Sequence, residues 1–217
     1  AFEPALDYVI AKLPRFPFDK FTNASNLLGT QMKATGEIMG IGSNLEECLL
    51  KGIRSLETGV HHLYNHKFDG MTTEELKAYI AEFRDDNIFA VAELLRRGVG
   101  VDDIHGITKI TSFFIEAMKN IVEMESVLAS KPFELDTLRA AKKMGFGDKY
   151  IAKLWGCGES EVFKFRRQHG LFPVFRMVDT CHTGAYIPYF YSSYTGENAS
   201  VHTDKKKIVV LGAGPIR

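Results

Sequence analysis

Residues 110–129 read ITSFFIEAMKNIVEMESVLA, and they form the longest segment of the chain with helical periodicity. The apolar residues recur every three or four positions, which places them along one face of an α-helix, with Glu125 at the edge of that face. They are Phe114, Met118, Ile121, Val122 and Leu128. This pattern predicts a long helix packed on one face, in a chain that is mainly α.

Helical signals continue on both sides of this segment, over residues 43–170. Ser43 with Glu46 has the spacing of a capping box, and Thr72 with Glu75 repeats it. Gly98 is suited to end the helix that precedes it, because glycine accepts the left-handed backbone of a helix terminus. We therefore expect several short helices around the long one.

Further along, one turn and three more helices are expected. Val101–His105 is predicted to form a short turn before the long helix. Asp136 is predicted to cap a helix over residues 138–144 that ends at Gly145. Two short helices are predicted over residues 148–155 and 159–169.

The two flanks are expected to be β-rich. Residues 7–12 and 32–41 have strand composition, and residues 171–200 are extended and aromatic. The apolar run at 208–211 leads into Gly212 and Gly214, as a parallel strand leads into a phosphate-binding turn. Because no helix follows this turn, we expect a piece of a larger protein that binds no nucleotide tightly by itself.

Composition excludes several classes of protein. The 217 residues carry 27 basic and 27 acidic side chains, so zero formal net charge gives no general attraction to nucleic acid or to anionic membranes. No apolar run approaches the ~20 residues that span a bilayer. Cys48, Cys157 and Cys181 are odd in number and far apart, which disfavours a disulfide framework and favours the cytoplasm. Cys48 is expected in the core, and Cys157 could be an exposed thiol.

One histidine cluster has partial metal-ligand spacing. His62 and His66 are four residues apart, with His61 beside them, and such a pair on a helix can hold a metal. No nearby cysteine or pair of acids completes a ligand set, however, and the cluster follows Gly59 at an expected helix end. We therefore favour a solvent-exposed loop and predict no metal site. The adjacent acidic pairs of the chain indicate helix starts and turns, so no catalytic residue is predicted either.

The helix pair over residues 148–169 resembles a helix-turn-helix. Its second helix carries Lys164, Arg166 and Arg167, which are residue types that contact phosphates and base edges. Against this, Glu159 and Glu161 lie at the start of that helix, where a recognition helix meets the groove. Nucleic-acid binding is kept as the alternative function.

Three stretches together resemble one family, the large subunit of carbamoyl phosphate synthetase. The most specific is QMKATGEIMGIG at residues 31–42, which continues as far as Glu57. The others are residues 2–21 at the start and RMVDTC at 176–181, with YSSY at 191–194 and VLGAGPIR at 210–217. The chain departs from the family pattern after Cys181, where HTGAY lacks the usual acid before the aromatic residue.

The resemblance implies a helical oligomerisation domain flanked by β-rich remnants of two ATP-grasp-type halves. Residues 1–57 would be the tail of the first half, 58–200 the oligomerisation domain, and 201–217 the start of the second half. The parent would be a ligase that makes carbamoyl phosphate from bicarbonate, ammonia (usually from glutamine) and ATP. It would serve arginine or pyrimidine biosynthesis. The chain itself is expected to hydrolyse no ATP.

The resemblance also assigns roles to single residues. Met32 and Glu37 resemble residues that line the internal tunnel for carbamate, and Arg217 resembles an arginine on its far side. The alternative is that Met32 packs in the core, Glu37 pairs with a basic residue and Arg217 is only a chain end. No cofactor is expected in this chain, whereas the parent would use ATP, magnesium or manganese, and potassium. Expected partners are a second copy, the other parent domains and the glutaminase small subunit, with no nucleic acid and no membrane.

Overall fold

A computed structural model describes residues 6–18, 20–21, 23–179 and 184–212. Near its N-terminus, β1 (Val9–Arg15) pairs antiparallel with β2 (Gly36–Gly42), and Val9 lies opposite Gly42. A second hairpin near the C-terminus pairs β3 (Val174–Met177) with β4 (Phe190–Ser193). Everything between the two hairpins is helices and their connections.

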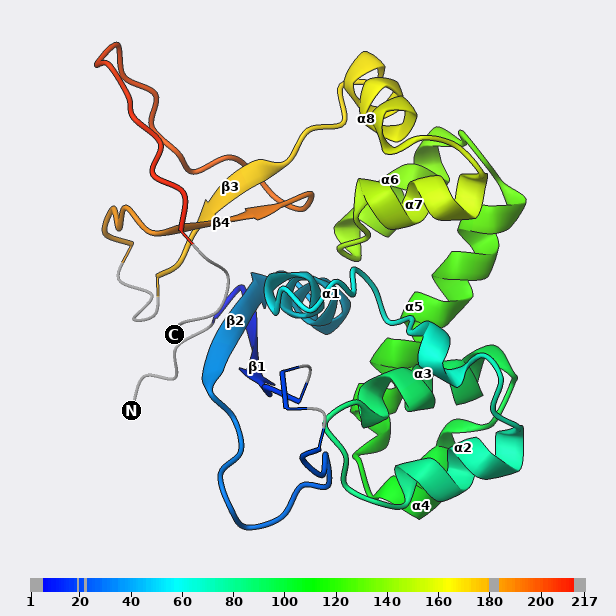
Figure 1. The fold of residues 1–217 in the computed structure, drawn as a ribbon. Helices are drawn as coiled ribbons and strands as arrows, with labels where there is room; N and C mark the ends of the chain where they lie inside the picture. Colours follow the sequence, from blue (N-terminus) through cyan, green and yellow to red (C-terminus); the bar gives the residue numbers. More distant parts are fainter. Residues whose placement is uncertain (1–5, 19, 22, 180–183, 213–217) are drawn as a thin grey trace.

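The helices form two groups joined by the longest one (Figure 1). The short helices α2, α3 and α4 gather around one end of α5, and α6, α7 and α8 lie toward its other end. Helix α1 lies against the first hairpin and also contacts α5. The helical elements are α1 (Leu45–Ser55), η1 (His66–Phe68), α2 (Thr73–Ile80), α3 (Asn87–Arg96), α4 (Val101–Thr108), α5 (Ser112–Ser130), α6 (Leu135–Lys143), α7 (Asp148–Trp155) and α8 (Glu159–Gln168).

Helix α1 approaches the first hairpin closely because of a glycine. A Cβ atom added to Gly40 in β2 would lie only 2.2 Å from the carbonyl oxygen of Cys48. In the same interface, a Cβ atom added to Gly52 of α1 would lie 2.6 Å from Leu13 and 3.2 Å from Ile38 of the hairpin. The glycines in the strand and in the helix therefore set the spacing between the two elements.

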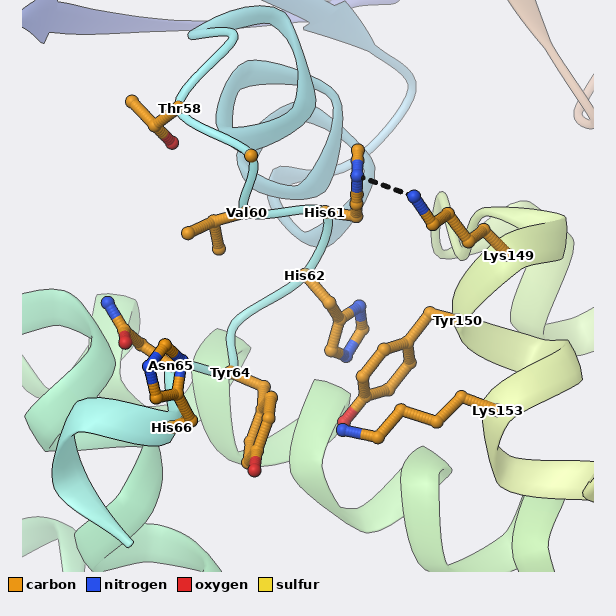
Figure 2. A pocket seen from close by; sticks show the side chains of 11 residues that line it. Thr58, Val60, His61, His62, Tyr64, Asn65, His66, Lys149, Tyr150 and Lys153 are labelled. Carbon is orange, nitrogen blue, oxygen red and sulfur yellow. Dashed lines mark hydrogen bonds between the residues drawn. The ribbon is translucent and has the colours of Figure 1, made fainter.

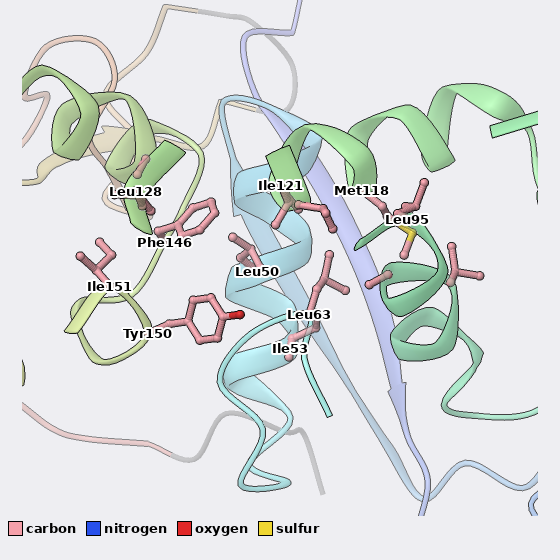
Figure 3. Packing of buried hydrophobic residues seen from close by; sticks show 14 of the residues in the cluster. Leu50, Ile53, Leu63, Leu95, Met118, Ile121, Leu128, Phe146, Tyr150 and Ile151 are labelled. Atoms are coloured by element: carbon pink, nitrogen blue, oxygen red, sulfur yellow. The ribbon is translucent and has the colours of Figure 1, made fainter. Parts of the chain in front are cut away.

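One continuous hydrophobic core connects α1 to both groups of helices (Figure 3). Leu50 and Ile53 of α1 are buried, and they share this core with Ile121 of α5. Phe146 and Ile151 extend the core to the helices after α5. The hairpin, α1 and the helices are thus packed as one unit, with no break in the core at residue 57.

A buried carboxylate ties the second hairpin to α1. Glu47 accepts hydrogen bonds from the Ser43 amide at 2.8 Å and from Ser193 Oγ at 3.1 Å. Its other oxygen lies 2.8 Å from Lys51 Nζ, and Lys51 also donates to the backbone carbonyl of Ser192 in β4. Because a buried charge must be paired, this cluster holds β4 against the start of α1.

The predicted mainly α fold is confirmed, and several details with it. Thr72 and Glu75 form a capping box, with the Thr72 amide 2.7 Å from the Glu75 carboxylate. Gly98 has a positive φ of 81° just after α3. Cys48 is fully buried, as expected.

Four expected boundaries are wrong. The second strand begins at Gly36 rather than at residue 32, which leaves Met32 on an exposed loop. Asn44 caps α1, and its side chain accepts a hydrogen bond from the Glu47 amide. The helix therefore begins one residue later than the Ser43 pattern implies. Val101 begins a full helix, α4, instead of a short turn. Glu134, not Asp136, caps α6 by accepting from the Thr137 amide at 2.7 Å.

Two further expectations are wrong for reasons of packing. Phe114 lies outside the buried face of α5, and Ile115 takes its place in the core. The run 208–211 forms no strand within the described part of the chain, and its side chains are exposed. A lone apolar run has no partner strand here to supply the hydrogen bonds and burial that a sheet requires.

Candidate functional site

A buried polar network lies where the segment after α1 meets α3 and α5. Glu125 of α5 is 7 % exposed and accepts from the Nε and Nη2 atoms of Arg96 in α3, both at 2.8 Å. It also accepts from Nε2 of His62 at 2.9 Å. Arg96 in turn donates to the backbone carbonyl of Leu63. The network therefore fastens the segment after α1 to both α3 and α5.

The protonation states of this network follow from burial and pairing. Burial alone would raise the pKa of Glu125, but the hydrogen bonds from Arg96 and His62 outweigh it and leave that pKa below its usual value. Burial lowers the pKa of His62, and the bond to Glu125 offsets this only in part. At neutral pH a neutral imidazole therefore donates Nε2–H to a charged carboxylate, and Nδ1 carries a free lone pair.

A pocket of about 500 Å³ opens beside this network (Figure 2). One wall is the segment that holds His61, His62 and Tyr64, and the other is α7. The ring of His62 stacks on that of Tyr150 with centroids 3.7 Å apart. The pocket joins aromatic surface to nitrogen-bearing side chains, which suits it to small-molecule binding.

A second ionic cluster orders the helices after α5. Asp148, at the start of α7, accepts from Lys142 Nζ at 2.8 Å and from Arg166 Nε at 2.7 Å. Burial would raise the pKa of Asp148, but these two cations hold it below its usual value. The cluster joins α6, α7 and α8, so its charges stabilise the fold.

This cluster argues against the helix-turn-helix interpretation. Arg166, which would face nucleic acid under the alternative function, is mostly buried and is bonded to Asp148. The guanidinium group of Arg167 lies over the rings of Phe163 and Phe172. Arg166 is therefore engaged within the fold, unlike the solvent-facing arginines of a recognition helix, whereas Lys164 and Arg167 are exposed on α8.

Large apolar side chains are exposed at the start of α5 and on the loop before α3. Phe113 is 66 % exposed, and its ring meets that of Phe114 edge-on at 5.5 Å. Ile110 lies just before them, and Phe83 is 72 % exposed on the loop between α2 and α3. Exposed aromatic side chains of this kind are typical of surfaces that contact another protein.

Comparison with protein families decides the identity of this helical unit. Residues 37–170, more than half of the chain, match the family described as carbamoyl-phosphate synthetase large chain, oligomerisation domain. The chain belongs to this family. The resemblance read from the sequence is thereby confirmed. The match to the oligomerisation domain begins at Glu37, so it includes most of β2 and all of α1.

The structure places two of the three expected tunnel residues. Met32 is 86 % exposed on the loop before β2, so its side chain packs in no core formed by the described residues. Glu37, in β2, forms an ion pair with Lys12 of β1 at 2.7 Å. Arg217 and Gly214 lie outside the described residues, whereas Gly212 is exposed with open space around it.

The histidine cluster differs from the expected exposed loop at one residue: His61 and His66 are exposed, whereas His62 is not. His62 is buried, His61 accepts from Lys149 Nζ at 2.9 Å, and His66 begins η1. Within the described ranges, no three His, Cys, Asp or Glu side chains are grouped as metal ligands are. In the same ranges, no helix is long and apolar enough to cross a bilayer. Cys157, considered as an exposed thiol, is half-buried, and burial raises its pKa.

Sequence reasoning missed the central role of Glu125. It follows Ile121 and Val122 and precedes Leu128, so it lies on the buried face of α5. A carboxylate at such a position needs a buried cation or donor, and that requirement was the available signal. Arg96 and His62 gave no comparable signal, because each is remote from Glu125 in sequence.

Proposed function

We propose that the chain is the self-association and linker module of a carbamoyl-phosphate synthetase large chain. The observation that carries this proposal is the family match over residues 37–170. The continuous core and the two ionic networks support it, because a spacer between catalytic units must be rigid. The two hairpins would then join this rigid unit to the catalytic halves on either side.

The proposed association surface comprises Phe113 and Phe114 at the start of α5. Neither ring belongs to the core, and both are large enough to anchor an interface. A second copy of the chain would cover these rings and remove them from water. Burying one such side chain contributes about 2 kcal/mol, so four rings across a two-fold interface contribute a substantial part of the association energy.

Light scattering coupled to size-exclusion chromatography tests this proposal across a range of concentrations. A dimer or larger species that dissociates on dilution is expected. The double variant Phe113→Ser/Phe114→Ser should shift the equilibrium toward monomer, whereas Phe175→Ser, on β3, is the matched control and should not. A strict monomer at high concentration would mean that the chain acts as a spacer and that association needs other domains.

The parent's reaction belongs to the same proposal. The parent would combine bicarbonate, ammonia (usually from glutamine) and ATP in the cytoplasm, with a small subunit as the glutaminase. Residues 1–57 would end the first half, residues 58–200 would space the halves, and residues 201–217 would begin the second half. ATP turnover by the chain alone would contradict this division, because the nucleotide sites would lie in the halves.

The tunnel roles of Met32, Glu37 and Arg217 stay part of this proposal. The exposure of Met32 on the loop before β2 makes its side chain available to a neighbouring domain. Among the described residues Glu37 forms one ion pair, with Lys12, and its side chain is 41 % exposed. In the full-length parent, Met32→Trp should impair transfer of the intermediate while each half keeps its own ATP hydrolysis. Equal loss of both hydrolytic activities would instead indicate a folding defect.

A further inference from the structure

We propose that the pocket between residues 58–66 and α7 binds a small organic phosphate with a flat apolar body. The proposal does not depend on self-association, because the pocket lies away from the rings at the start of α5. Among the described residues it joins three features: two cations with no acidic partner, aromatic lining, and a buried ring nitrogen with no hydrogen bond.

The first feature is uncompensated positive charge. Lys149 and Lys153 are four residues apart on α7, which puts both ammonium groups on one face of the helix (Figure 2). Neither forms an ion pair within the described residues: Lys149 donates to His61, and Lys153 Nζ lies 3.7 Å from the centroid of the Tyr64 ring. Moreover, the described residues that line the pocket include no Asp or Glu. Two neighbouring ammonium groups without a carboxylate favour a phosphate group, which carries close to two negative charges at neutral pH.

The second feature is the apolar lining. The rings of Tyr64 and Tyr150 line the pocket, and Val60 adds an aliphatic wall. Figure 2 shows the Tyr64 and Tyr150 rings on opposite sides of the Lys153 ammonium group. Tyr150 is only 8 % exposed because His62 stacks on it, so the accessible apolar surface is mainly that of Tyr64 and Val60. A ligand that is only an ion would leave this surface in contact with water, whereas an aromatic or other flat body would cover it.

The third feature is His62. Its Nε2 is committed to Glu125, and its buried Nδ1 has no hydrogen-bond partner among the described residues. A buried polar atom of this kind is uncommon and calls for a partner. Since the neutral ring leaves Nδ1 as an acceptor, the missing partner is a donor, such as a hydroxyl or amino group on the ligand. The ligand class is thus an organic phosphate whose apolar body carries a hydrogen-bond donor.

Isothermal titration of the 217-residue chain with 4-hydroxyphenyl phosphate tests the proposal. This probe has the phosphate, the flat body and the donor, whereas tyramine has the same hydroxyphenyl body with a positive charge in place of the phosphate. We expect the phosphate probe to bind and tyramine not to bind. Inorganic phosphate should bind more weakly than the aryl phosphate.

Variants of the two lysines locate the site. Lys149→Met/Lys153→Met should weaken binding about tenfold or more, as expected for the loss of two charges near ~5 Å in a solvent-accessible site. Lys164→Met, an exposed lysine on α8, is the matched control and should leave affinity unchanged. In ¹⁵N spectra of the histidine rings, the Nδ1 signal of His62 should move when the probe binds.

Three results would overturn the proposal. They are the absence of binding up to about 10 mM of the aryl phosphate, equal binding of tyramine, and unchanged affinity in the Lys149→Met/Lys153→Met variant. The circular dichroism spectrum of that variant should match the spectrum of the unmodified 217-residue chain, because both lysines are exposed. A negative result in this test would not contradict the proposal of self-association, because the oligomeric state is measured without the probe.

Discussion

Replacing Glu125 with glutamine should destabilise the fold strongly. The change keeps the shape of the side chain but removes the charge that accepts two hydrogen bonds from Arg96 and one from His62. Arg96 would then keep a guanidinium group that is only 18 % exposed and has lost its main partner. Removing one member of a buried ion pair costs about 3–5 kcal/mol, because the remaining charge is left without compensation.

The surroundings of Arg96 reduce this cost somewhat. Glu93 Oε2 lies 3.5 Å from Arg96 Nη1, and the carbonyl of Leu63 accepts from Nη2, so some compensation remains. We therefore expect Glu125→Gln to lower the free energy of unfolding by about 2–4 kcal/mol. Urea unfolding followed by circular dichroism, with linear extrapolation, measures this quantity.

A control on the same helix makes the result interpretable. Glu123 is 63 % exposed and lies 3.8 Å from Lys119, so Glu123→Gln should change stability by less than about 0.5 kcal/mol. If both variants lost the same small amount, the argument from burial and pairing would be refuted. In a double-mutant cycle with Arg96→Met, the two losses should also fall short of additivity by about 1–3 kcal/mol.

Two other predictions concern His62 and Gly40. Because burial puts the pKa of His62 below its usual 6.5, the unfolded chain takes up the proton first, and stability should fall as pH drops below that value. His62→Gln should flatten this slope in urea unfolding, and an unchanged slope would show that another group titrates. Gly40→Ala would place a Cβ 2.2 Å from the Cys48 carbonyl oxygen and should cost about 3 kcal/mol, whereas Gly29→Ala, in open space, should cost little. Equal midpoints for these two alanine variants in thermal unfolding would contradict the close contact between β2 and α1.

The buried polar clusters show where sequence reasoning reached its limit. Glu125 and Arg96 lie 29 residues apart, and Glu47 and Ser193 lie 146 apart. Periodicity reports on neighbours within one helix, so it cannot pair charges from different elements. The histidine cluster is the clearest case, since adjacent His61 and His62 differ in exposure because of what α5 and α7 place beside them.

Surface residues were misjudged for a related reason. Phe114 fits the apolar spacing of α5, yet the core contains Ile115 instead. Near the end of a long helix, a small rotation of the contact face exchanges one neighbouring residue for another, and only the packed partner fixes that rotation. The helix caps also differ by one or two residues from those expected. Several polar side chains near each helix start compete for the free backbone amides, and the sequence does not show which one binds them.

The helical fold, most of its segments and the family could be inferred from the amino-acid sequence, because these depend on local periodicity and on motifs of adjacent residues. The burial of Cys48 could be inferred as well, since an apolar stripe implies a core. The folded structure was needed to show which charges are buried together and that a cationic pocket forms between residues 58–66 and α7. Those features arise from groups brought together by packing, and their energies depend on burial and distance, which a linear sequence does not contain.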